Sequence, residues 1–283
     1  MLRLFRELMF SAHRRRAAIA AAFATCVASV SFGATADTIK IGGTGAAETM
    51  LLQLGAKFES ETGIAVKLLP HLGSTGGFRA LADGVVDIAV SGRKPNSEET
   101  RKGVTIALSA RTPFVFVTSN KIPDDIRSSE LANIIESATP IWADGRPVRI
   151  ILRPKTDSDT VLIGEYFPKA KDAIETARRR PGIVVAGTDG NNADLAETTQ
   201  GSLTAAAYVQ VATERRDLRL LSIDGIAPTL ENFKSGKYPY EKLLHIIVWN
   251  STSTKSERFI AYLRSPEALR LMHDAGLIPL GED

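Results

Sequence analysis

The chain has 283 residues, of which 44% are hydrophobic and 24% charged, with 22 glycines and 13 prolines. This ordinary globular composition excludes a disordered, collagen-like or disulfide-scaffold protein. The formal net charge of +3 would suit a basic protein, but its source is the N-terminal segment, where residues 1–16 hold five arginines and one acid.

Residues 1–36 have the pattern of a secretory signal peptide. After the basic stretch comes an uncharged apolar run, residues 17–32, and then Ala34-Thr35-Ala36 before Asp37. This pattern predicts export and cleavage after Ala36, since the apolar run is shorter than the roughly 20 residues of a spanning helix. A membrane anchor and a lipid-modified Cys26 are the rival interpretations, and Arg14-Arg15 leaves twin-arginine export as an alternative to the Sec route.

Cleavage would change both the charge and the chemistry of the chain. It removes five of the 35 Lys and Arg and one of the 32 Asp and Glu, so the formal charge becomes −1. It also removes Cys26, the single cysteine of the sequence. We therefore expect an exported, periplasmic protein with no basic surface for nucleic acid and no disulfide or cysteine metal ligand.

Strand and helix patterns alternate along the rest of the chain. Helices are predicted over residues 46–61, 78–82, after Asn96 with Glu99 in a capping box, 128–137, 160–167 after a polar loop at 153–159, 256–263 and from Ser265 to Gly276. Strands are predicted at residues 38–43, 64–69, 87–90, 104–108, 114–118, 148–152, 183–186 and 245–249, with further elements at 205–211 and 218–223. This order indicates an α/β fold with mostly parallel sheets, whose ligands bind beyond the carboxyl ends of strands.

Familiar catalytic and metal-binding motifs are absent from the sequence after residue 36. The histidines there, His71, His245 and His273, have no metal-ligand spacing, and there is no G-x-S-x-G elbow or phosphate-binding P-loop. Gly43-Thr44-Gly45 lacks the third glycine of a dinucleotide fingerprint. We therefore expect no metal, no cofactor and no enzymatic activity.

Four predicted strand-to-helix loops are rich in Gly, Ser and Thr. They are Gly42-Gly43-Thr44-Gly45, Gly73-Ser74-Thr75-Gly76-Gly77, Ser91-Gly92-Arg93 and Asp157-Ser158-Asp159-Thr160. Glycine lets backbone N–H groups approach a ligand, helix N-termini present unpaired donors, and arginine offers a planar fork for two oxygens. One such loop is more often a turn or a helix cap, but four of them with two arginines predict a receptor for a small oxyanion. The predicted ligand-binding residues are Thr44, Gly45, Ser74, Thr75, Gly76, Ser91, Arg93, Arg153, Ser158, Asp159 and Thr160.

Several of these motifs resemble those of the type II periplasmic solute-binding proteins, in the phosphate-binding branch that serves ABC importers. The similar segments are Gly73-Ser74-Thr75-Gly76-Gly77, Asp87-Ile88-Ala89-Val90-Ser91, Arg153 with Ser158 and Thr160, Tyr238-Pro239, and Ser265-Pro266-Glu267 with Ala275-Gly276-Leu277-Ile278-Pro279-Leu280. The last of them is structural, so it supports the fold rather than the ligand.

The resemblance implies a two-lobed α/β fold, with mixed sheets flanked by helices and a two-strand hinge. Lobe I would be residues 37–116 plus 226–283, and lobe II residues 117–225. It further implies a monomer that closes on phosphate or a related oxyanion and delivers it to an ABC permease in the inner membrane.

Two departures from the family pattern bear on the ligand. The family's Asp after the matched serine, which accepts the proton of hydrogen phosphate and excludes sulfate, is replaced by Gly92, and the glycine of its S-G-T motif is replaced by Asp159. Either Asp157 or Asp159 has taken over the acceptor role, or both cap the helix and the anion is a different one. A sensing module for another small anion and an exported phosphate-ester hydrolase are the alternative functions.

Overall fold

The structure is a computed structural model that describes residues 37–121 and 125–281. The predicted signal peptide, including Cys26, lies outside the described residues. None of the helices in the described ranges has the length and apolar character needed to cross a bilayer.

The N-terminal part forms three parallel strands in the order β2-β1-β3, with bounds β1 (Thr38–Gly43), β2 (Ala65–Leu69) and β3 (Ile88–Ser91). Ile39 and Ile41 alternate with polar residues in β1 and are fully buried, as the pattern predicts. The connecting elements are η1 (Gly45–Ala47), α2 (Glu48–Thr62) and α3 (Gly73–Ala82), and α4 (Ser97–Arg101) follows β3. Asn96 and Glu99 form the predicted capping box of α4.

A second set of parallel strands has the order β8-β6-β7, with bounds β6 (Arg149–Leu152), β7 (Val184–Val185) and β8 (Ser202–Ala207). Three helices connect them, α6 (Ser158–Tyr166), α7 (Pro168–Arg178) and α8 (Asp189–Thr198). Around them lie α5 (Leu131–Glu136), α9 (Tyr208–Glu214), the paired β5 (Asp125–Ile126) and β10 (Ser222–Ile223), and β9 (Arg219–Leu220).

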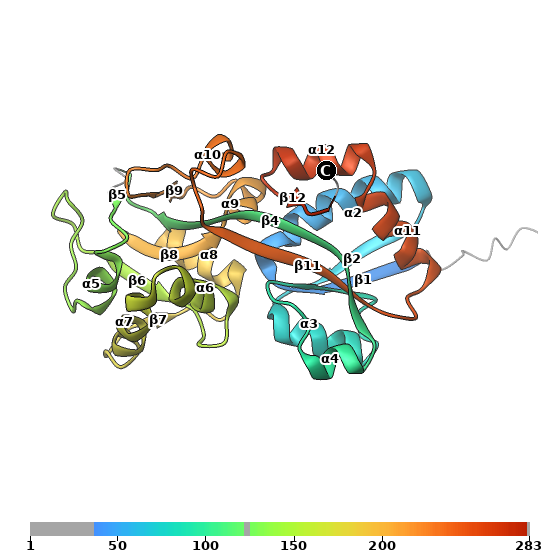
Figure 1. Cartoon of the computed structure of the whole chain (residues 1–283), viewed down its shortest axis with the longest axis horizontal. Helices are drawn as coiled ribbons and strands as arrows, with labels where there is room; N and C mark the ends of the chain where they lie inside the picture. The colour runs from blue at the N-terminus through green and yellow to red at the C-terminus, as the bar shows by residue number, and fades with distance from the viewer. Residues whose placement is uncertain (1–36, 122–124, 282–283) are drawn as a thin grey trace, which may run out of the picture. The chain divides into compact units, whose positions relative to one another are not determined.

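Two long antiparallel strands, β4 (Val104–Thr118) and β11 (Glu241–Trp249), join the two parallel sets into one mixed sheet. β11 pairs with β3, and the last part of β4 pairs with β8, so the order is β2-β1-β3-β11-β4-β8-β6-β7. Figure 1 shows the two strands side by side between the two sets. The remaining elements are α10 (Leu230–Lys234), α11 (Thr254–Leu263), α12 (Pro266–Asp274) and β12 (Ile278–Pro279), which pairs with β4.

Each parallel set has its own hydrophobic core. Phe58 and Phe259 pack edge to face in the first, while Phe114 and Phe116 do so in the second. Residues from the segment after 226 also join the second core, including the fully buried Tyr238, whose hydroxyl donates to the Phe114 carbonyl at 2.7 Å.

Several predicted elements differ from the structure. Residues 104–108 and 114–118 are one strand, because the intervening residues stay extended against β11, and Pro113 lies where β4 leaves β11 and joins β8. The prediction that 73–77 is a loop is wrong, since α3 begins at Gly73. Helices α7 and α8 were not predicted, and the sheet as a whole is mixed rather than mostly parallel.

Candidate functional site

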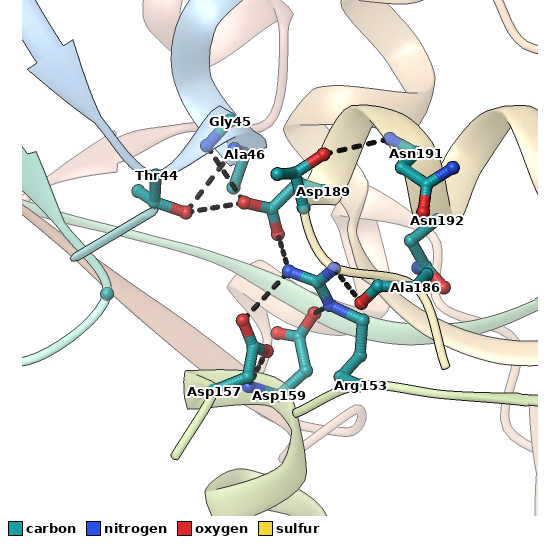
Figure 2. Close-up of polar contacts among 12 residues, drawn as sticks. Thr44, Gly45, Ala46, Arg153, Asp157, Asp159, Ala186, Asp189, Asn191 and Asn192 are labelled. Atoms are coloured by element: carbon teal, nitrogen blue, oxygen red, sulfur yellow. Dashed lines mark hydrogen bonds and ion pairs between the residues drawn. The ribbon is translucent and has the colours of Figure 1, made fainter. Parts of the chain in front are cut away.

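The first of the predicted anion-binding loops holds a carboxylate from the same chain. The Thr44 hydroxyl and the Gly45 backbone N–H, just beyond β1, both donate to Oδ2 of Asp189 at 2.8 Å. Asp189 is the first residue of α8, and Thr188 caps that helix. Figure 2 shows its carboxylate between this loop and Arg153. Asp189 therefore occupies the donors that the sequence assigned to a bound anion.

Arg153 follows β6 and is buried, with 3% of its surface exposed. Its guanidinium donates to the Ala186 carbonyl at 2.8 Å, to Oδ2 of Asp157 at 2.8 Å and to Oδ1 of Asp189 at 3.4 Å (Figure 2). The carboxylate of Asp159 lies 3.9 Å from Nε, which is too long for a hydrogen bond. The positive charge of Arg153 is thus compensated within the protein.

Lys242 contributes a second buried cation from β11. Its ammonium lies 2.5 Å from Oδ1 of Asp159 and 3.8 Å from Oδ1 of Asp189, and the side chain is fully buried. A buried charge is tolerated only when it is paired and hydrogen-bonded. We refer to Arg153, Lys242, Asp157, Asp159 and Asp189 as the charged cluster. With every member ionised, its formal charge is −1.

The three carboxylates of the charged cluster are not equivalent. Burial and the neighbouring charge of Asp159 raise the pKa of Asp157 to about 6. Burial alone would raise the pKa of Asp189 as well, but the charges of Lys242 and Arg153, together with the hydrogen bonds from Thr44 and Gly45, hold that pKa below its usual value. Oδ2 of Asp159 and Nε of Arg153 are buried without a hydrogen bond to any described residue. Within the described residues, Oδ2 of Asp159 therefore remains available as an acceptor and Nε of Arg153 as a donor.

A cavity of about 390 Å³ adjoins the charged cluster. Its wall includes Ser158, which stands between Asp157 and Asp159 at the start of α6, and Ser74 from the first turn of α3. The cavity is lined by Ser74, Gly92, Arg93, Lys94, Thr156, Ser158, Val161, Leu162, Glu165, Tyr166, Glu241, Leu243 and His245. Because unpaired N–H groups and a partial positive charge concentrate at helix N-termini, the starts of α3 and α6 favour an anion here.

Gly92 lies next to both Ser74 and Ser158. Its N–H donates to Oγ of Ser74 at 2.9 Å, which leaves the Ser74 hydroxyl hydrogen free to donate. A Cβ on residue 92 would lie 2.7 Å from Oγ and 3.0 Å from Cβ of Ser158. An aspartate, as in the family pattern, would therefore collide with Ser158 in this arrangement.

The other predicted residues have partners within the chain or lie outside the cavity lining. The Ser91 hydroxyl is buried and donates to the Arg93 carbonyl, and Arg93 lines the cavity while its guanidinium makes two 2.8 Å bonds to Glu99. The Thr160 hydroxyl donates to the Arg153 carbonyl, and Thr75 and Gly76 lie in the first turns of α3 without lining the cavity. Of the eleven predicted residues, the cavity brings together Ser74, Arg93 and Ser158.

The structure separates the roles of the two aspartates at the start of α6. Asp157 is the N-cap, since its Oδ1 accepts from the Asp159 N–H at 3.0 Å. Asp159 instead points into the charged cluster and pairs with Lys242. Capping by both residues is therefore wrong, whereas the idea that one of them replaces the family's proton acceptor stays a prediction.

Sequence reasoning missed three important residues, Asp189, Lys242 and His245. Asp189 lies in Gly187-Thr188-Asp189-Gly190, a loop after a strand whose composition is similar to that of the four predicted anion-binding loops. Lys242 is the second residue of β11 and directly precedes the apolar part of that strand, so a charged residue at this position was a signal that the sequence offered. His245 is 2% exposed and lines the cavity, its Nδ1 lies 2.8 Å from the Ser109 hydroxyl, and burial and Lys94 lower its pKa.

Comparison with known protein families identifies the family to which this chain belongs. A family model described as the PBP superfamily domain matches residues 28–267. The chain belongs to the PBP superfamily. The strand order agrees with this assignment, because two parallel sets joined by two crossing strands form the two-lobed architecture that the motif resemblance implied.

Individual proteins are also similar to this chain. The phosphate-binding protein PstS of Borreliella burgdorferi is 26% identical over 221 residues, which are 73% of this chain and 77% of that protein. PstS of Bacillus subtilis is 24% identical over 252 residues, 86% of this chain and 81% of that protein. A substrate-binding protein assigned to phosphate ABC transport in Clostridium perfringens, solved with bound phosphate, superposes with a TM-score of 0.71 at 15% identity, covering 86% of this chain and 100% of that one.

Proposed function

We propose that this member of the PBP superfamily is a periplasmic solute-binding protein that captures inorganic phosphate or a related small oxyanion and delivers it to an ABC permease. The observation that carries the proposal is the convergence of two helix N-termini, each with a serine, on one cavity. The two curated relatives named as phosphate-binding proteins support the choice of anion. No bond of the ligand is made or broken in this function.

The anion is placed at the end of the cavity formed by Ser74, Gly92 and Ser158. Thr44 and Gly45 already donate to Asp189, and the charge of Arg153 is compensated by carboxylates. These three residues therefore do not contact the anion in this proposal and act through the charged cluster. Hydrogen bonds to charged groups contribute about 1.5–3 kcal/mol each, and micromolar binding requires about 8 kcal/mol. The two serine hydroxyls and the N-terminal amides of α3 and α6 are sufficient in number to supply this.

Opening and closing of two lobes would admit and release the anion. We propose that the first lobe contains residues 37–113 and 241–283, and the second residues 114–240, since Phe114 and Phe116 pack in the second core and pair with β8. This differs from the division at residue 226 expected above, because Phe233 and Tyr238 pack in the second core. The signal peptide pattern supports the periplasmic location, and we propose that the protein acts as a monomer.

Calorimetric titration tests this function. The purified protein, freed of co-purified ligand by unfolding and refolding, is titrated with phosphate, sulfate and molybdate in turn. We expect saturable micromolar binding of phosphate, and a 10- to 100-fold loss in Ser158→Ala, the value of one hydrogen bond to an anion. Ser60→Ala, an exposed serine of α2, is the matched control. Absence of binding of all three oxyanions would contradict the proposal.

A further inference from the structure

The cavity is larger than inorganic phosphate requires. Its volume of about 390 Å³ lies in the range of roughly 300–1,000 Å³ that is typical of pockets for small organic ligands. A five-atom oxyanion held by Ser74 and Ser158 would fill one end of it. The residues along the rest of the wall therefore indicate what else the ligand contains.

Helix α6 forms one side of the cavity along its length. Ser158, Val161, Leu162 and Glu165 all line it, and their spacing of three, four and seven residues places them on one face of the helix. From Ser158 to Glu165 the helix rises about 10 Å. The lining on this side thus changes in order from hydroxyl to apolar to carboxylate.

Strand β11 contributes a second part of the lining, in the same order. Glu241, Leu243 and His245 alternate along one face of the strand and all line the cavity. His245 pairs in register with Ser91, next to Gly92, so this end of β11 lies with the serines. At the other end, the Tyr166 hydroxyl bonds to the backbone of Glu241, at 2.9 Å to its carbonyl and 3.0 Å to its N–H. Both walls therefore have a hydroxyl-rich or imidazole end, an apolar middle and an acidic end.

The acidic end is open to a cationic partner. Glu165 is exposed, and no hydrogen bond or ion pair of its side chain is present within residues 37–121 and 125–281. Among the described residues, the carboxylate of Glu241 has one polar partner, the partly exposed Arg111 at 3.5 Å. At the serine end the starts of α3 and α6 favour an anion, and Lys94 lines the cavity. The guanidinium of Arg93 is paired there with Glu99, and the adjoining charged cluster has a formal charge of −1. The two ends of the cavity therefore differ in the sign of the charge that they favour.

We propose that the ligand is a zwitterion, in which a phosphate or phosphonate head is joined by a short hydrocarbon stem to an ammonium group. The head binds at Ser74 and Ser158, the stem contacts Val161, Leu162 and Leu243, and the ammonium group lies between Glu165 and Glu241. The inference rests on the proposed function, because it uses the same anion position and extends the ligand along the cavity.

Three probes of increasing complexity test the proposal by calorimetry: inorganic phosphate, propylphosphonate and 3-aminopropylphosphonate. Each buried methylene tightens binding about fourfold, so propylphosphonate should bind at least tenfold more tightly than phosphate. The ammonium group of 3-aminopropylphosphonate should tighten binding by a further factor of about two to five, which corresponds to the energy of an exposed ion pair. Propylphosphonate binding no more tightly than phosphate, or 3-aminopropylphosphonate no more tightly than propylphosphonate, would overturn the inference while leaving the proposed function intact. Failure of all three to bind would contradict both.

Two substitutions locate the stem and the ammonium group. Val161 is 47% exposed, so Val161→Phe can narrow the cavity without disturbing the core and should weaken propylphosphonate at least tenfold. Val85, also 47% exposed but outside the cavity lining, provides the control Val85→Phe. Glu165→Gln should remove the preference for 3-aminopropylphosphonate over propylphosphonate, whereas Glu257→Gln, an exposed glutamate of α11, should retain it. An unchanged preference in Glu165→Gln would overturn the assignment.

Discussion

Replacement of Asp189 by asparagine should make the protein less stable and at the same time increase its affinity for phosphate. Asp189 accepts 2.8 Å hydrogen bonds from Thr44 and Gly45 and lies 3.4 Å from Arg153 and 3.8 Å from Lys242. Removing one partner of a buried ion pair costs about 3–5 kcal/mol. Because asparagine keeps one carbonyl acceptor, we expect about 3 kcal/mol.

The opposite sign for affinity follows from the charge of the cluster. Asparagine changes its formal charge from −1 to 0 next to the proposed anion position. Two unit charges about 4 Å apart interact by about 1 kcal/mol in water and by about 4 kcal/mol near a protein surface, and the energy is inversely proportional to the distance between them. The affinity for phosphate should therefore increase at least about fivefold.

Urea denaturation followed by circular dichroism measures the loss of stability, and calorimetry measures the affinity. At about 2–4 °C per kcal/mol for a domain of this size, the melting temperature should fall by about 6–12 °C. Asp194→Asn is the matched control, since Asp194 lies on the same helix and its side chain is 66% exposed beside Arg216, so it should change stability by less than about 1 kcal/mol. Wild-type stability together with unchanged or weaker phosphate binding in Asp189→Asn would refute the reasoning.

Three further predictions concern the same region. Because the pKa of Asp157 is raised to about 6, this carboxyl makes the folded state less stable as the pH rises from about 4 to 6. Asp157→Asn, which keeps a good N-cap, should reduce that loss between about pH 4 and 6, and an unchanged pH profile of urea denaturation would contradict this. Lys242→Met should destabilise the protein by about 3–5 kcal/mol, because three carboxylates would then share one cation, and a wild-type melting temperature would show that the pairing is unimportant. Gly92→Ala should lower the free energy of unfolding by about 1–3 kcal/mol, because its methyl group would collide with Ser158, and it should also weaken phosphate binding. In Gly164→Ala the added Cβ would meet nothing closer than 3.6 Å, so this control variant should stabilise α6 by up to about 1 kcal/mol in the same urea assay.

Much of the fold was predictable because its local patterns are strong. The alternation in β1, the capping box of α4 and the Ser265 cap of α12 are each set by a few neighbouring residues, and the structure has all three. The single strand β4 was not predictable in the same way, since residues 109–113 stay extended through pairing with β11 and β12, which are distant in sequence. Helix α8 has few apolar residues at regular spacing, so its sequence gives little periodic signal.

The candidate site shows the same division. Ser74 and Ser158 were selected as members of strand-to-helix loops, and they do line one cavity. The partners of Arg153 could not be predicted, because Asp189 lies 36 residues away and Lys242 belongs to a strand that meets the site only through the sheet topology. Single-sequence motifs identified donors for an anion, but not that another part of the chain supplies a carboxylate to some of them.

A crystal structure of the protein with bound phosphate would test the account most directly. We predict that phosphate lies between the hydroxyls of Ser74 and Ser158, with Asp189 still accepting hydrogen bonds from Thr44 and Gly45. Phosphate bound to Thr44 and Gly45, with Asp189 displaced, would contradict the account.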